Sequence, residues 1–135
     1  MASTAARTNE TVIREAYAAF NEGDMETVFS IMSPDVEWVE PQGSRFSGTH
    51  RGADSVMEEV FAPVAAEMAE FVVEVDRVID AGDTVVVLGT DRGTVRDSGE
   101  TVAAPFAHVI ELRDGQITRC SNYTDTHAWE QALAA

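Results

Sequence analysis

The carboxylate best suited to acid–base chemistry in this sequence is Glu40, which ends the run Val-Glu-Trp-Val-Glu just before Pro41. Side chains alternate between the two faces of a strand, so Trp38 and Glu40 share one face. Either both face solvent, or the carboxylate lies beside an aromatic wall in a pocket. A pocket would raise its pKa by desolvation and make it a general base near neutral pH. Glu40 is therefore the first candidate catalytic residue.

Asp91, in a charged and β-rich segment, is the second candidate catalytic residue. If it faced Glu40 across a pocket, like-charge repulsion would raise the pKa of one carboxyl and split the pair into acid and base. The alternative interpretation is that Asp91 forms an ion pair with Arg92 or another nearby arginine.

Candidate substrate contacts are an amide and aromatic side chains. A buried Asn122 would need hydrogen-bond partners, which a substrate can supply. Trp38 and Phe20 are candidates for a pocket wall, and plain core packing is the alternative. His108, in an apolar strand, is more typical of a core or interface histidine than of a catalyst. The remaining expectations are a solvated His50, an unreactive Cys120 thiol and no metal site at Asp125 and His127.

The elements that must position these residues follow from hydrophobic periodicity and turn signals. Val12, Ala16, Ala19 and Phe20 have the spacing of an amphipathic helix, which Gly23 ends. Helices come first and β-rich segments separated by Asp- and Gly-containing turns follow, which predicts an α+β fold. We predict helices at 9–21, 25–32, 54–67 and 127–135, a strand at 36–40, a loop at 41–52, and β-rich segments at 71–80, 84–96, 101–112 and 116–125.

The length of 135 residues predicts one domain, residues 9–135, after a flexible N-terminus at residues 1–8. No apolar run is long enough to span a bilayer, and Met1 to Ala6 lacks the features of a signal peptide. The single cysteine, Cys120, cannot form an internal disulfide, which is consistent with a reducing cytoplasm.

The net charge is −15, with nine arginines and no lysine. An acidic surface repels phosphate backbones and anionic lipids, so we expect no nucleic-acid or membrane partner. The acidity favours a halophilic origin, with a high-salt cytoplasm that screens the charge. A solubility device or a GC-rich genome is the alternative.

Several stretches together resemble one family: AAFNEGD at 18–24, SPDVEW at 33–38, GTHRG at 48–52, and FAHVIELRDGQI at 106–117 with Tyr123 and Asp125 following. With the order of elements, they resemble the NTF2-like superfamily, specifically its SnoaL-like and ketosteroid-isomerase-like branch. The resemblance covers nearly the whole chain. It implies a conical α+β barrel, in which N-terminal helices pack on a strongly curved, mostly antiparallel sheet and enclose one deep apolar pocket.

The ketosteroid isomerase pattern places its catalytic base at Glu40, where an aspartate precedes proline in that family. Its helix tyrosine aligns with Ala16, next to Tyr17, and its acidic donor aligns with Ala107. The two oxyanion donors of that mechanism are therefore not carried over, which argues against steroid isomerisation by the same route.

Two other templates in the superfamily use the same positions. In limonene-epoxide-hydrolase-like members, a Tyr and an Asn fall on Trp38 and Glu40. Their Asp-Arg-Asp constellation falls on Asp91, Gly89 and Asn122. In polyketide-cyclase members the late-strand aspartate matches Asn122 or Asp125. Together, the templates imply that one set of strand side chains points into the pocket: Trp38, Glu40, Gly89, Asp91, Pro105, Ala107, Cys120, Asn122 and Thr124. Strict alternation places His108, Tyr123 and Asp125 on the opposite face, unless the last strand bulges.

The resemblance and the residues together predict a cofactor-free general acid/base enzyme of the isomerase, cyclase or hydrolase type, acting on a small apolar carbonyl or epoxide compound. Glu40 would move the proton, Asp91 would complement it, and Asn122 would orient substrate or water. The alternative is a non-catalytic ligand-binding or dimerisation module of the same fold. A homodimer is expected through the sheet face that carries Phe106, His108 and Ile110, because open sheets seldom leave such a face bare.

Overall fold

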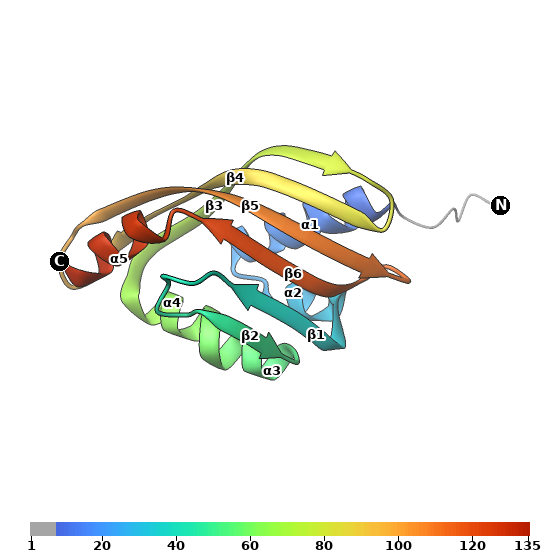
Figure 1. The fold of residues 1–135 in the computed structure, drawn as a ribbon, viewed down its shortest axis with the longest axis horizontal. Coiled ribbons are helices and arrows are strands. Elements are labelled where there is room, and N and C mark those ends of the chain that lie inside the picture. The colour runs from blue at the N-terminus through green and yellow to red at the C-terminus, as the bar shows by residue number, and fades with distance from the viewer. Residues whose placement is uncertain (1–7) are drawn as a thin grey trace.

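Six strands form one strongly curved, unclosed sheet in the order β2-β1-β6-β5-β4-β3, seen in the computed structural model, which describes residues 8–135 (Figure 1). The expectations for residues 1–7 lie outside the described residues. The strands are β1 (Met32–Glu40), β2 (Gly48–Arg51), β3 (Met68–Asp80), β4 (Thr84–Val95), β5 (Thr101–Arg113) and β6 (Gln116–Thr124). All neighbours are antiparallel except β1 and β6, which run parallel.

Helices α1 (Asn9–Glu22) and α2 (Met25–Ile31) begin and end at residues suited to helix termini. The Thr8 side chain accepts a hydrogen bond from the Thr11 backbone N–H, and Asp24 does the same for Thr27. Gly23 adopts a left-handed conformation with φ of 79° and ends α1. The amphipathic helix that the sequence predicts is confirmed.

A continuous helical segment follows β2 and consists of α3 (Ala53–Val56), the π-helical turn η2 (Met57–Phe61) and α4 (Ala62–Glu67). The Ala62 backbone N–H donates to the Met57 carbonyl, one residue further than in an α-helix. Pro63 has no N–H to donate to the preceding turn, which explains why the helix widens just before it. The last helix, α5 (Thr126–Ala134), begins at Asp125, whose side chain accepts from the Ala128 N–H.

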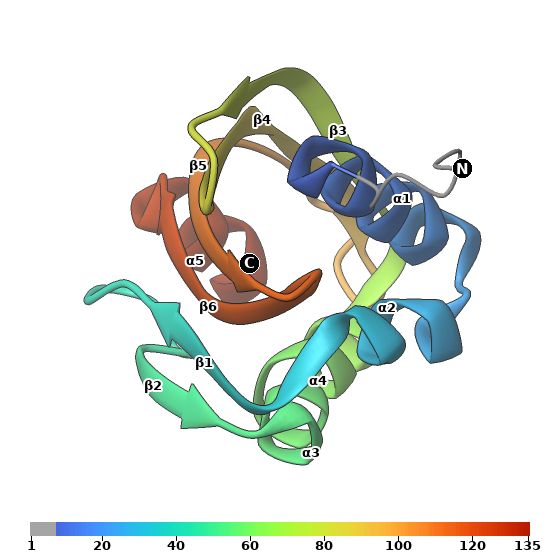
Figure 2. The same ribbon diagram turned by 90° about the vertical axis from the view of Figure 1, so that its right-hand side faces the viewer.

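The sheet bends around its concave face, and the helices cover that face (Figure 2). One cause of the bend is a register shift in β3 between Val75 and Arg77, opposite Gly89 of β4. A Cβ atom at residue 89 would lie 2.2 Å from the Glu74 carbonyl oxygen. Only glycine permits this close approach, so Gly89 is needed where β4 bends under β3.

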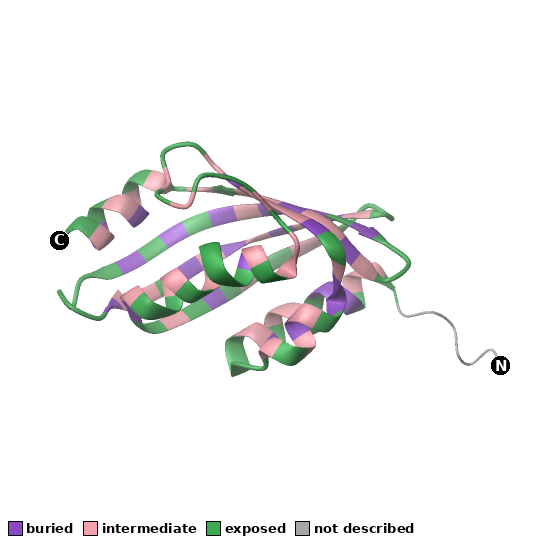
Figure 3. Ribbon diagram, turned by 90° about the horizontal axis from the view of Figure 1, so that it is seen from below, coloured by how far each residue is buried: buried purple, intermediate pink, exposed green. Residues whose placement is uncertain are grey.

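The core lies between the concave face and the helices, where buried and exposed residues alternate along the strands (Figure 3). One cluster, which includes Ile13, Val36 and Val87, joins α1 to the sheet. A second cluster seats α5 through Trp129 against Ala104 of β5. Of the helices within residues 8–135, none has the length and apolar character needed to cross a membrane.

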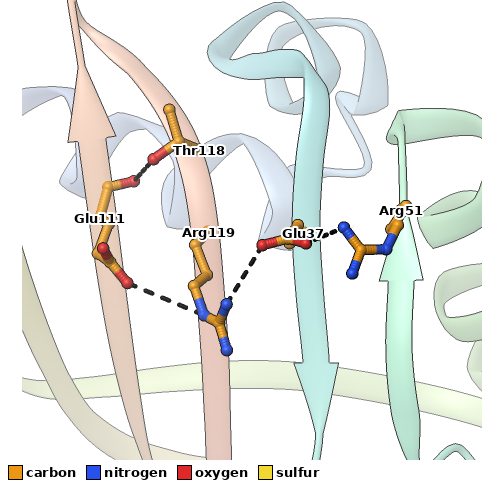
Figure 4. A network of polar contacts seen from close by, with 5 residues as sticks. All are labelled: Glu37, Arg51, Glu111, Thr118 and Arg119. Carbon is orange, nitrogen blue, oxygen red and sulfur yellow. Dashed lines mark hydrogen bonds and ion pairs between the residues drawn. The ribbon is translucent and has the colours of Figure 1, made fainter.

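Four side chains of alternating charge form a ladder across the outer, convex face (Figure 4). Arg119 of β6 contacts Glu111 of β5 at 3.9 Å and Glu37 of β1 at 3.2 Å, and Glu37 also pairs with Arg51 of β2. Each pair is directly cross-strand in the register. Such pairs contribute roughly 0.2–1 kcal/mol each, so the ladder favours the register of the parallel β1–β6 contact.

The predicted fold class is confirmed, and the differences concern element boundaries. The strand predicted at 36–40 begins at Met32, and the predicted loop at 41–52 contains β2. Because β2 has four residues and pairs only with β1, its glycine-flanked sequence carries too little alternation to be recognised.

Candidate active site

A cavity of about 380 Å³ lies between the concave sheet face and the helices α1, η2 and α4. Its volume falls within the range of small-molecule sites. The wall is rich in aromatic side chains that contact one another edge to face, as Trp38 and Phe61 do at 5.2 Å between ring centroids. These aromatic residues include Tyr17, Phe20, Trp38, Phe61, Phe71 and Trp129. Such a wall suits a flat, apolar molecule.

Glu40 lies at the end of β1, faces this cavity and is only 7% exposed. Trp38 Nε1 donates to Glu40 Oε2 at 2.6 Å, and Asn122 Nδ2 donates to Oε1 at 3.1 Å. Burial raises the pKa of Glu40 above its usual value, and the two donors and the positive charge of His50 offset this only in part. The predicted shared face of Trp38 and Glu40 is confirmed, and the carboxyl group is held in one orientation through both oxygens.

Asp91 faces the same cavity from β4 and is 6% exposed. Burial raises its pKa to about 7; a side-chain hydrogen bond with Trp129 lowers it, and the negative charge of Glu40 raises it further. Arg92 pairs instead with Glu74 at 3.2 Å, so the alternative of an Asp91–Arg92 ion pair is wrong. A carboxyl group that titrates near neutrality can both hold and release a proton.

Tyr17 and His108 form a second polar pair, with the tyrosine hydroxyl hydrogen-bonded to His108 Nδ1. The imidazole also stacks on Phe106, with 4.0 Å between ring centroids. Burial lowers the pKa of His108 to about 3, and the Asn122 side chain opposes that shift. Burial raises the pKa of Tyr17 well above its usual value, and the charges of Cys120 and Asp91 add to this. Both side chains are therefore neutral at pH 7.

His50, on β2, contacts the loop after β1 and the π-helical turn η2, whereas the sequence led us to expect it in solvent. That expectation is wrong, because the side chain is only 12% exposed. His50 Nε2 donates to the Phe46 carbonyl at 2.8 Å, and Nδ1 lies 3.1 Å from a Glu59 oxygen. Burial lowers the pKa of His50, but these acceptors and the charge of Glu40 outweigh it and leave the pKa raised. His50 thus joins the loop after β1 to η2.

The face assignment for β5 is wrong. Pro105 and Ala107 were expected to point inward, but they lie on the convex face, and the inward residues are Phe106, His108 and Ile110. Ala107 is therefore not a wall residue of the cavity. The face proposed for dimer contact is the interior face, so dimer contact through Phe106, His108 and Ile110 is wrong, and the homodimer itself stays a prediction.

The remaining predicted orientations are mostly confirmed. Gly89 faces inward, and Cys120, Asn122 and Thr124 line the cavity from β6. Tyr123 is 60% exposed on the other side, and Asp125 is exposed and begins α5, so neither lies in the cavity. Burial raises the pKa of the Cys120 thiol. Within residues 8–135, no group of three His, Cys, Asp or Glu side chains is placed to hold a metal ion.

The sequence analysis placed His108 on the wrong face of its strand, although the pattern of polar residues in the same strand predicts the correct face. Along residues 101–113, the odd positions include Thr101, Glu111 and Arg113, whereas the even positions are apolar apart from His108. Polar residues at one parity place that parity in solvent. The even positions, His108 among them, therefore face the interior.

The curved sheet, the helices that cover it and the aromatic-walled cavity define an α+β cone of the NTF2-like class. The chain belongs to the SnoaL-like domain family, which matches residues 13–120. An NTF2-like protein of Burkholderia thailandensis is 32% identical and superposes with a TM-score of 0.89, covering 95% of this chain and 98% of that one. The predicted family is confirmed.

Two further relatives differ in what is known of them. TerC, whose crystal structure was determined with polyporic acid, is 33% identical, has a TM-score of 0.85, and covers 94% of this chain and 98% of its own. An uncharacterised protein of Mycobacterium tuberculosis is 28% identical over 124 residues, covering 91% of this chain and 94% of its own length.

Proposed function

We propose that the protein is a cofactor-free acid/base enzyme that enolises an apolar carbonyl compound, with Glu40 as the base and Asp91 as the acid. The observation that carries this proposal is the pair of buried carboxyl groups in one aromatic-lined cavity. The two differ in their surroundings: Glu40 accepts from Trp38 and Asn122, which favours its carboxylate form, whereas Asp91 has a pKa of about 7.

The reaction follows from those protonation states. Glu40 takes the proton from the carbon next to the carbonyl group, while Asp91 gives its proton to the carbonyl oxygen, and an enol forms. Return of a proton to a different carbon isomerises the compound, and attack of the enol carbon on a second carbonyl group closes a ring. The aromatic wall holds the carbon skeleton and excludes water, which strengthens both proton transfers.

The relatives support a small-molecule site of this kind. TerC was co-crystallised with polyporic acid, and the match covers nearly the whole of this chain. Polyporic acid is therefore a suitable first ligand to titrate. Both tryptophans of the protein, Trp38 and Trp129, line the cavity, so quenching of their fluorescence reports binding.

Enolisation can be tested without knowing the natural substrate. The protein is incubated with 2-tetralone in D2O, and exchange of the protons next to the carbonyl group is followed by NMR. We expect Glu40→Gln to lower the exchange rate by roughly 10²–10⁴-fold, the usual range for loss of a general base. Glu37→Gln is the matched control, because Glu37 lies on the same strand but on the convex face.

Equal exchange rates for Glu40→Gln and the native protein would refute the assignment of the base. Saturable fluorescence quenching by 2-tetralone or polyporic acid, with no exchange above the buffer rate, would instead identify a non-catalytic binding module.

A further inference from the structure

The Asn122 amide lies between Glu40 and His108, and its orientation is set by Glu40. A carboxylate only accepts hydrogen bonds, so the amide nitrogen faces it, as the 3.1 Å contact from Nδ2 to Oε1 shows. The amide oxygen must then face the other way. The Oδ1 atom is fully buried, beyond the reach of solvent or a ligand, and among residues 8–135 it has no partner with complete hydrogen-bond geometry.

The neighbour on that side is His108, which is directly opposite Asn122 in the β5–β6 register and is itself buried. The Asn122 side chain raises the pKa of His108, as a hydrogen-bond acceptor beside the imidazole does. A buried carbonyl oxygen is seldom left unpaired, and the His108 ring is the group that can donate to Oδ1 from that side.

The neutral imidazole carries its proton on one of two nitrogens, and the two choices are not equal. With the proton on Nε2, His108 donates to Asn122 Oδ1, and Nδ1 accepts from the Tyr17 hydroxyl. With the proton on Nδ1, Oδ1 stays unpaired and the tyrosine hydroxyl needs another acceptor. The first arrangement satisfies all three side chains.

We propose that Tyr17, His108 and Asn122 form a hydrogen-bond chain in which every donor points toward Glu40, so that Tyr17 and His108 are positioning residues for the base. This inference rests on the proposed function only for the role of Glu40 as a base; the chain itself does not depend on it. The tyrosine hydroxyl is then occupied by His108 and does not contact the substrate. Asp91 is left as the donor to the substrate oxygen.

The direct test is the tautomer of His108, measured by long-range 1H–15N NMR on the full chain at pH 7. The other two histidines are identified with His50→Gln and His127→Gln. We expect a protonated Nε2 and an unprotonated Nδ1. A protonated Nδ1, or a doubly protonated ring, would overturn the chain whether or not the protein is an enzyme.

The second test separates a positioning role from a substrate contact and uses Tyr17→Phe, with the exposed Tyr123→Phe as its matched control. Loss of the tyrosine hydroxyl weakens the hydrogen-bond chain to Glu40 and raises the pKa of its carboxyl group. The acidic limb of the pH profile of the exchange rate then moves to higher pH by about 0.2–0.5 unit. The plateau rate should change less than about threefold. A plateau loss of about 100-fold or more with an unmoved limb would show that Tyr17 contacts the substrate and would refute the chain.

That limb belongs to Glu40, whose titratable neighbours are the same in Tyr17→Phe and in the native protein. They are His50 of β2, Asp91 of β4, His108 of β5 and Cys120 of β6. An unmoved limb together with an unchanged plateau would also overturn the proposal, since Tyr17 would then have no effect on the base.

Discussion

Replacement of Asp91 by asparagine should stabilise the protein at alkaline pH. In the native protein the folded state holds the Asp91 proton up to a pKa of about 7, whereas an unfolded aspartate releases it near 3.8. Above the folded pKa, folding must therefore bury a charge, which Asp91→Asn removes while keeping an acceptor for Trp129. Because the folded pKa is raised, the stability of the native protein falls as pH rises from 3.8 to about 7 and then levels off.

The magnitude follows from the pKa. Between pH 5 and pH 8 the native protein passes through about two units of this window, and each unit corresponds to about 1.4 kcal/mol. The free energy of unfolding of Asp91→Asn minus that of the native protein should therefore increase by about 2–3 kcal/mol between these pH values. This figure already contains the repulsion between Asp91 and Glu40, which the variant relieves.

The assay is urea unfolding followed by Trp fluorescence at pH 5, 6, 7 and 8. Asp76→Asn, which alters an exposed aspartate on β3, is the matched control for the loss of one carboxyl group. A difference between Asp91→Asn and the native protein that does not change with pH would refute the reasoning. It would mean that Asp91 is ionised in the folded state at pH 5, and the proposed acid would lose its basis.

Two further predictions concern the frame of the site. Gly89→Ala should lower the free energy of unfolding by about 2–3 kcal/mol, because the new Cβ would lie 2.2 Å from the Glu74 carbonyl oxygen and 2.7 Å from the Phe106 ring. A decrease of less than about 0.5 kcal/mol, measured by urea unfolding, would contradict this. His50→Gln should lower the free energy of unfolding by up to about 1 kcal/mol at pH 5.5 and by less at pH 8.5. The pKa of His50 is raised in the folded state, so its protonated form, paired with Glu59, stabilises the fold at low pH and this stabilisation is lost as the pH rises. A cost that grows with pH in thermal unfolding would count against that pairing.

The helices and hairpins were predictable because their signals are local. Gly23 and Asp24 mark the break between α1 and α2, and the turns at 81–83, 97–99 and 113–115 separate the four long strands. The partner of β1 was not predictable in this way. No spacing of residues in the sequence predicts that β1 lies parallel to β6, because the pairing of these two strands depends on the packing of the whole sheet.

The candidate site was predictable in part, for the same reason. Glu40 was identified from the alternation within its own strand, and Asp91 from its expected position across the pocket. The inward position of His108 was missed, because its face depends on the parity of β5, which was set by an alignment to Ala107 instead of by the polar residues at Glu111 and Arg113. The contacts of His50 depend on η2, whose widened turn has no signal in the sequence beyond Pro63.

The parallel contact between β1 and β6 also sets when the site can exist. Glu40 and Asn122 are 82 residues apart in the chain and meet only after the last strand has joined the first. A ribosome-bound chain that has not yet released β6 contains β1 with Glu40 and most of the cavity wall, but it lacks the Asn122 amide that donates to the Glu40 carboxylate. Contacts of such sequence separation form late and slowly. The Glu40–Asn122 contact is therefore a readout of completed folding, which a chain without β6 cannot form.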